Sequence, residues 1–136
     1  MRLKVIFAAD WTVVAPVDSR GRCRVMEDLH ALRRTDSTAR AQLTALLERV
    51  ACDAPQRDPR RSRRVGEGIY EFKTLQGWRI FYFVDRDRVI VRTELCRKPR
   101  PRELRTIVHR AQAVRARYLE ARSAGTIVME DDSCEV

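Results

Sequence analysis

The sequence predicts an α+β fold, in which an N-terminal strand is followed by a helical hairpin, a three-stranded antiparallel meander and a C-terminal helix. Changes in the spacing of apolar residues carry this prediction. Apolar residues recur at helical spacing between residues 23 and 52, alternate as in half-buried strands between residues 69 and 96, and return to helical spacing after residue 101. The chain has 136 residues, 44% of them hydrophobic, which suits one folded domain, and we assign that domain to residues 1–125.

The first half of the chain combines one strand with two helices. β-Branched and aromatic residues predict a strand over residues 3–8, and Pro16 with the turn residues 18–21 ends the extended segment. An apolar stripe predicts a helix over residues 23–34. Asp36 or Ser37 can cap a second helix, which stops before Pro55. Because the connection between the two helices is so short, we expect them to pack as a hairpin.

The meander follows an arginine-rich loop at residues 57–64. Its strands are expected over residues 69–75, 78–84 and 89–96, with turns at Gly77 and at residues 85–88. The numbers of opposite residues in a hairpin sum to a constant, so the turns predict the cross-strand pairs Lys73–Arg79, Arg79–Glu94 and Phe81–Arg92. A last helix begins near Pro101, which suits a first turn, and ends at Gly125.

The two faces of this meander differ in character. One is almost wholly apolar, so we expect helices to cover it; it comprises Tyr70, Phe72, Trp78, Ile80, Tyr82, Val89, Val91, Leu95 and the polar Thr93. The other carries Glu71, Lys73, Arg79, Phe81, Arg92 and Glu94, and we expect it to be free of helices. Arginines there could clamp phosphates while an aromatic ring stacks on a base. The alternative is a solvated face with cross-strand ion pairs.

The charge distribution favours a polyanionic partner. The chain carries 28 Lys and Arg against 19 Asp and Glu, a net charge of +9, and the segment from Arg97 to Arg122 has nine bases and two acids. Residues 126–136 instead form an acidic tail with four acids and no base, which we expect to be flexible. Folded back over a basic groove, this tail would compete weakly with nucleic acid.

Several classes of protein are disfavoured. No apolar run approaches the length of a membrane span or of a signal-peptide core, so we expect a cytoplasmic protein with no membrane partner. The four cysteines are scattered, without a C-x-x-C pair or a cluster of histidines, so we expect no metal site and no cofactor.

The segment from Gly68 to Asp85 resembles the RelE/HigB/ParE superfamily of bacterial and phage toxins, and most closely its HigB-like branch. The resemblance rests on a glycine, a Tyr-Glu pair, a basic residue, a glycine turn and an arginine followed by an aromatic residue, here Gly68, Tyr70-Glu71, Lys73, Gly77, Arg79 and Tyr82. The order of strand, hairpin, meander and helix is also that of the RelE-like toxin fold. The resemblance implies the toxin of a type II toxin–antitoxin system that cuts mRNA, usually on the ribosome, and is silenced by a cognate antitoxin.

The resemblance also implies a chemistry and a set of residues. In such a metal-independent endoribonuclease the RNA's own 2′-OH attacks the adjacent phosphate, and cations stabilise the charge that develops. Carried over to this chain, the catalytic residues are Lys73, Arg79 and Lys98. The RNA-binding residues that we expect beside them are Arg97, Arg92, Phe81, Glu71 and Arg100.

The end of the meander departs from the HigB-like pattern. The aromatic residue before the basic pair is replaced by Leu95, the spacer before Pro99 is missing, and no Tyr or His lies between Cys96 and Ile107 to transfer protons. The alternative function is therefore a non-catalytic or gyrase-directed member of the same fold, which acts as a binding or inhibitor module.

Overall fold

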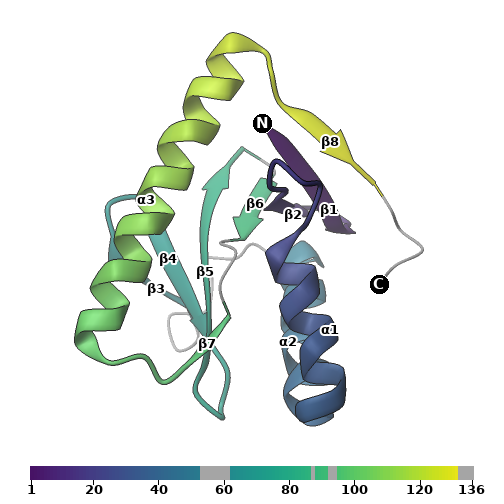
Figure 1. The fold of residues 1–136 in the computed structure, drawn as a ribbon, viewed down its shortest axis with the longest axis vertical. Helices are drawn as coiled ribbons and strands as arrows, with labels where there is room; N and C mark the ends of the chain where they lie inside the picture. The colour runs from purple at the N-terminus through teal and green to yellow at the C-terminus, as the bar shows by residue number, and fades with distance from the viewer. Residues whose placement is uncertain (53–61, 87, 92–94, 132–136) are drawn as a thin grey trace.

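The computed structural model describes residues 1–52, 62–86, 88–91 and 95–131 and has an α+β architecture (Figure 1). Its strands form one mixed sheet in the order β3-β4-β5-β6-β2-β1-β8, and the short β7 also pairs with β5. The strands are β1 Arg2–Ala8, β2 Thr12–Pro16, β3 Ser62–Gly66, β4 Ile69–Lys73, β5 Trp78–Asp85, β6 Arg88–Val91, β7 Cys96–Arg97 and β8 Val128–Glu130. The helices are α1 Arg24–Thr35, α2 Ser37–Cys52 and α3 Pro101–Ala124.

The predicted helical hairpin is present. Residue Asp36 separates α1 from α2. Its side chain caps the second helix, because Oδ1 accepts a hydrogen bond of 3.0 Å from the backbone N–H of Ala39. The apolar stripes of both helices pack against one face of the sheet, where they meet Phe72, Ile80 and Tyr82. This face of the meander is the one that the sequence predicted to be covered.

The N-terminal segment forms two strands where the sequence analysis expected one. β1 and β2 pair antiparallel, and β2 continues into the sheet by pairing in parallel with β6. Val13 packs toward α1 and α2, whereas Val14 packs toward α3, and both are fully buried. A central strand buried on both faces reads as a continuous apolar run, which is why alternation did not reveal it.

The meander keeps the predicted register through its first turn and into its second. Lys73 lies opposite Arg79 on β4 and β5, and Tyr82 lies opposite Val91 on β5 and β6. The predicted third strand over residues 89–96 is confirmed where β6 pairs with β5. Residues 92–94 lie outside the described residues, and Cys96 belongs to the separate short strand β7. Continuing the β5–β6 register would place Arg79 opposite Glu94, but Arg79 lies opposite Cys96, so the register with β7 differs by two residues from the register with β6.

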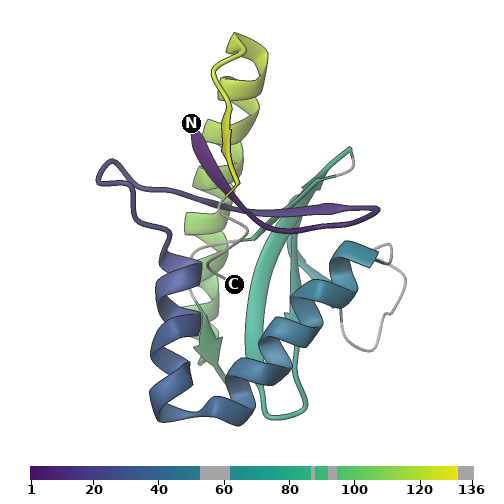
Figure 2. The same cartoon turned by 90° about the vertical axis from the view of Figure 1, so that its right-hand side faces the viewer.

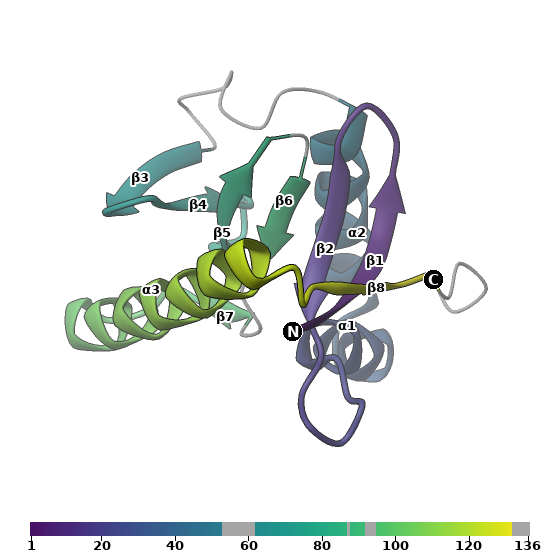
Figure 3. The same cartoon turned by 90° about the horizontal axis from the view of Figure 1, so that it is seen from above.

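The second face of the meander is not free of helices, which corrects the sequence prediction. Helix α3 crosses it, and Ile69 and Phe83 pack there against Ala111, Val114 and Tyr118. Figures 2 and 3 show α3 on one side of the sheet and the hairpin of α1 and α2 on the other. The physical reason is that the apolar stripe of α3 has to be buried, and the first face is already occupied. The backbone of β3 comes close to α3 at Gly66, where an added Cβ would lie 2.6 Å from Cγ1 of Val108.

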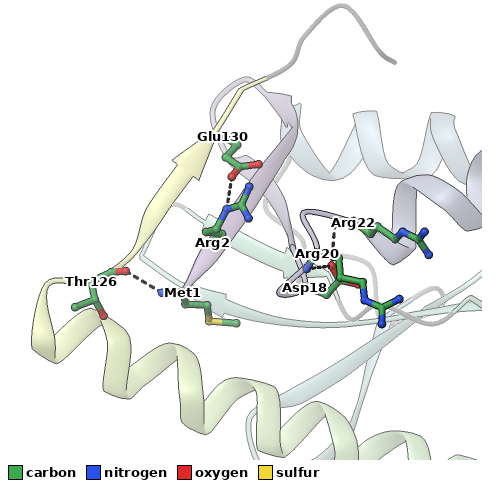
Figure 4. Close-up of polar contacts among 7 residues, drawn as sticks. All are labelled: Met1, Arg2, Asp18, Arg20, Arg22, Thr126 and Glu130. Carbon is green, nitrogen blue, oxygen red and sulfur yellow. Dashed lines mark hydrogen bonds and ion pairs between the residues drawn. The ribbon is translucent and has the colours of Figure 1, made fainter.

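Residues 1–4 and 126–130 meet at the edge of the sheet that lies beyond β1. β8 pairs in parallel with β1, the terminal amine of Met1 donates a hydrogen bond of 2.8 Å to the carbonyl of Thr126, and Arg2 Nε lies 2.5 Å from Glu130 Oε1 (Figure 4). The nearby turn is closed by Oδ1 of Asp18, which accepts two backbone hydrogen bonds. Val128–Glu130, within the tail that we expected to be flexible, form a strand, and residues 132–136 lie outside the described residues.

No helix in the described part of the chain is long and apolar enough to cross a membrane.

Candidate nucleic-acid interface

Two of the three predicted catalytic residues lie directly opposite each other in the sheet. Lys73 ends β4 and Arg79 stands next to it on β5, so both side chains project from the same face, with Cys96 of β7 as the next residue in the row. The Lys73 side chain is exposed, whereas that of Arg79 is only 16% exposed. The predicted juxtaposition is therefore present, but at the margin of a face that α3 partly covers.

Glu71 lies in the neighbouring row and is almost completely buried, at 1% exposure. Its Oε1 accepts a hydrogen bond of 2.6 Å from Arg79 Nη1 and another of 2.6 Å from Arg63 Nε. The prediction that Glu71 touches RNA is wrong, because its carboxylate is enclosed and engaged by two guanidinium groups. Two arginines share one carboxylate, so the cluster keeps a positive charge.

Arg63 is a residue of this cluster that the sequence analysis did not assign to the site. β3 pairs with β4 so that Arg63 lies opposite Glu71, and Glu71 lies opposite Phe81. The sequence gives only a weak signal for β3, because Ser62–Gly66 is a short stretch whose arginine-rich composition is typical of a loop. The Arg63 side chain remains 59% exposed, so it is available to an approaching anion.

The predicted aromatic platform is absent from this site. Phe81 is fully buried, at 0% exposure, so it cannot stack on a base and serves as core instead. Arg92 lies outside the described residues. Arg100 is exposed at the start of α3 and lies 3.9 Å from Glu103, a separation typical of a weak surface ion pair.

The basic pair Arg97 and Lys98 is fastened to the turn between β4 and β5. Arg97 Nε donates a hydrogen bond of 3.1 Å to the carbonyl of Gln76, and the backbone N–H of Lys98 donates one of 2.9 Å to the carbonyl of Gly77. Gly77 has a φ of 89°, and an added Cβ there would lie 2.6 Å from Cγ of Lys98. Glycine is required at this position both for the backbone conformation and for the close passage of the lysine stem.

Arg97 and Lys98 lie outside the row formed by Lys73, Arg79 and Cys96, because of the register in which β5 pairs with β7. Arg97 lies opposite Trp78, which places it on the face of the helical hairpin, whereas Cys96 shares the face of Arg79. Lys98 follows the strand and is exposed. The four bases Lys73, Arg79, Arg97 and Lys98 therefore surround one end of the meander and do not all line a single face.

The titratable groups near this end of the sheet are suited to charge stabilisation more than to proton transfer. Glu71 is enclosed by arginines, and Tyr82 is buried on the other face, where its hydroxyl shares a hydrogen bond with Ser62. Burial raises the pKa of Tyr82 to about 12, so its phenol stays protonated at neutral pH. The chemistry that the cluster offers is the binding of phosphate and the stabilisation of negative charge by guanidinium and ammonium groups.

Comparison with known families places these elements in context. A protein-family model described as phage-derived protein Gp49-like (DUF891) matches residues 30–119, well over half of the chain. The chain belongs to this family. The matched region of the Gp49-like chain includes the row of Lys73 and Arg79, the turn before β5 and most of α3. The Gp49-like family is associated with RelE and other toxin-like proteins.

Searches of curated proteins and of solved structures found no match to the Gp49-like chain.

Proposed function

We propose that this Gp49-like protein is the toxin of a type II toxin–antitoxin system, close to the HigB-like branch, and that it cleaves mRNA without a metal or cofactor. We further propose that it acts on the ribosome and is silenced by a cognate antitoxin. The observation that carries the proposal is the pairing of Arg79 with Lys73 across the sheet, beside the Arg97–Lys98 segment.

The geometry of Arg79 is suited to binding an RNA phosphate. A guanidinium has five N–H donors, and one from Nη1 goes to Glu71. The ion pair fixes the side chain against the sheet, so less rotational freedom is lost when a phosphate binds. Lys73 and Lys98 are exposed, and each supplies a mobile ammonium group beside this fixed arginine.

In the proposed reaction the 2′-oxygen of a ribose bonds to the adjacent phosphorus while the bond from phosphorus to the 5′-oxygen breaks. The 2′-OH loses its proton and the leaving 5′-oxygen gains one, which yields a 2′,3′-cyclic phosphate and a free 5′-OH. Arg79, Lys73 and Lys98 would stabilise the extra negative charge on the phosphorane oxygens. Alignment of the RNA on a ribosome would lower the demand for a strong protein base.

The test is a double substitution, Arg79→Ala with Lys98→Ala, compared with Arg33→Ala with Arg34→Ala. The control removes the same charge from exposed positions in the last turn of α1. Expression of the wild-type chain and of the control should arrest growth and produce mRNA fragments ending in cyclic phosphates, and the site variant should do neither. Circular dichroism verifies that the site variant is folded, and undiminished cleavage by that folded variant would refute the assigned site.

A second candidate function is a non-catalytic or gyrase-directed inhibitor of the same fold. The observation that favours it is the enclosure of Glu71 by two arginines, which leaves this carboxylate unsuited to act as a base. Growth arrest accompanied by intact mRNA and DNA damage would favour this candidate over the ribonuclease.

A further inference from the structure

A hollow of about 570 Å³ lies beside the basic end of the meander, between α2 and the turn that joins β4 to β5. Gln42, Leu46 and Arg49 line it from α2, Lys73 lines it from the end of β4, and Leu75 and Gln76 line it from the turn. The volume is within the range of pockets that take small ligands. Neither the proposed catalytic chemistry nor the packing of the core assigns a role to it.

The lining of this hollow combines positive charge with a small apolar surface. Arg49 and Lys73 are exposed bases, and no carboxylate is among the residues that line it. The buried side chain of Leu46 supplies an apolar wall, and Leu75 at the tip of the turn is 94% exposed, so its apolar side chain is open to a ligand. A ligand that suits this lining has an anionic group and a flat or apolar body.

Gln42 adds an unused hydrogen-bonding group. Its Oε1 is buried and accepts no hydrogen bond from any residue that the structure describes. Buried polar atoms of native proteins are nearly always paired, so this acceptor stands out. Because it is closed off from water, a nucleobase N–H would reach it only after the Gln42 side chain turns toward the hollow.

The hollow shares Lys73 with the row of bases described above. Lys73 lines the hollow and also lies opposite Arg79, while Arg97 and Lys98 are fastened to the turn that lines it. An RNA strand that runs past Lys73 would therefore meet both the row of bases and the hollow. A helix of a partner protein would need a longer apolar floor than Ala45, Leu46 and Leu75 provide.

We propose that this hollow is a nucleotide-binding subsite, in which Leu46 and Leu75 contact a base of single-stranded RNA while Arg49 and Lys73 hold its phosphates. The inference rests on the proposed function and adds a second contact region for its substrate. It also supplies the base contact that the buried Phe81 cannot make.

Photo-crosslinking tests the position of the RNA. The full chain carries p-benzoylphenylalanine in place of Leu75, or in place of the exposed Ser123 on α3 as a control, and is irradiated with a short labelled single-stranded RNA. We expect the probe at position 75 to label the RNA and the probe at position 123 to label it far less. Equal labelling from both positions overturns the proposal, as does labelling of an acidic helical peptide in preference to RNA at position 75.

Salt dependence tests the charge contact without relying on crosslinking. Arg49→Gln and Arg33→Gln each remove one base from the last turn of a helix, but only Arg49 lines the hollow. For Arg49→Gln, the slope of the logarithm of RNA affinity against the logarithm of salt concentration should shrink by about 0.7, the value for one phosphate contact of a single strand. An equal slope for both variants overturns the proposal.

The two proposals fail in different ways. Labelling of RNA at position 75 by a chain that cleaves no mRNA would leave the subsite standing and refute the ribonuclease. Cleavage of mRNA by a chain whose probe at position 75 labels no RNA would refute the subsite and leave the ribonuclease standing.

Discussion

The carboxylate of Glu71 and the guanidinium of Arg79 are joined by a hydrogen bond of 2.6 Å on the face of the sheet that α3 crosses. The glutamate is almost wholly removed from water, and the same oxygen accepts a second hydrogen bond from Arg63. Its other oxygen has no hydrogen-bond partner in the described part of the chain. A carboxylate in this setting depends on its arginine partners to offset the loss of hydration.

Removal of Arg79 should destabilise the fold much more than removal of Arg63. Arg79→Ala takes the less exposed partner from a buried carboxylate, and we expect the free energy of unfolding to fall by about 2 to 3 kcal/mol. Arg63 has a side chain that is 59% exposed, so Arg63→Ala should cost less than about 1 kcal/mol. Urea denaturation followed by circular dichroism measures both values, and equal losses would show that the two arginines support Glu71 alike.

Neutralising Glu71 should weaken RNA binding even though it makes the protein more positive. Glu71→Gln raises the net charge by one, which by itself favours a polyanion, but it loosens Arg79 because a neutral amide binds a guanidinium less strongly. We expect RNA affinity to fall several-fold in filter-binding measurements. The matched control is Glu67→Gln at an exposed position of the β3–β4 turn, which should raise the affinity slightly. A rise of the same size in both variants would mean that Glu71 acts only through its charge.

The hydroxyl of Tyr118 should contribute measurably to the attachment of α3. It donates a hydrogen bond of 2.6 Å to Oδ2 of Asp85 at the end of β5, and Arg122 pairs with the other oxygen of that carboxylate. Tyr118→Phe deletes the hydroxyl from a fully buried ring, and we expect a loss of about 1 to 2 kcal/mol in thermal or urea unfolding. Tyr70→Phe serves as the control, because the Tyr70 hydroxyl makes no hydrogen bond within the described residues, and the prediction fails if both changes cost the same.

Alkaline unfolding should report on Tyr82. Burial raises the pKa of Tyr82 from 10.0 to about 12, so the unfolded chain releases this proton more readily than the folded one. The contribution of Tyr82 to stability is therefore complete below pH 10 and is lost as the pH rises from about 10 to 12. Burial also raises the pKa of Tyr118, so the absorbance of tyrosinate during a pH titration should show a late-titrating component in the wild type that becomes smaller in Tyr82→Phe. If Tyr82→Phe instead removes absorbance that titrates near pH 10 and leaves the late-titrating absorbance unchanged, the assignment is contradicted.

Much of the local structure follows from the sequence. The N-cap of α2 at Asp36, the glycine turn at Gly77 and the end of α3 at Gly125 are each set by one residue and its immediate neighbours. The pairing of Lys73 with Arg79 was predictable because a tight turn fixes the register of the two strands that it joins. These features depend on contacts between residues that lie close together in the chain.

The features that the sequence analysis missed depend on distant contacts. Val13 and Val14 read as part of one extended segment, and only the parallel pairing of β2 with β6 shows that they are central to the sheet. The pairing that places Cys96 opposite Arg79 does not follow from the register of β5 with β6, which the sequence analysis had extended to Glu94. Arg63 joined the site because β3 pairs with β4, within a stretch whose composition is typical of a loop.

The sequence by itself determined three helices, the meander and the two residues Lys73 and Arg79 that lie opposite each other in it. The tertiary structure alone decided which face each helix covers, so that Phe81 and Glu71 became buried while Leu75 and Lys98 stayed exposed. Local rules fix where a strand turns and which side chains share a face. Local rules do not fix whether that face meets water or a helix. The hairpin of α1 and α2 covers one face of the sheet, so the apolar stripe of α3 packs on the other, and these contacts join segments that are far apart in the chain.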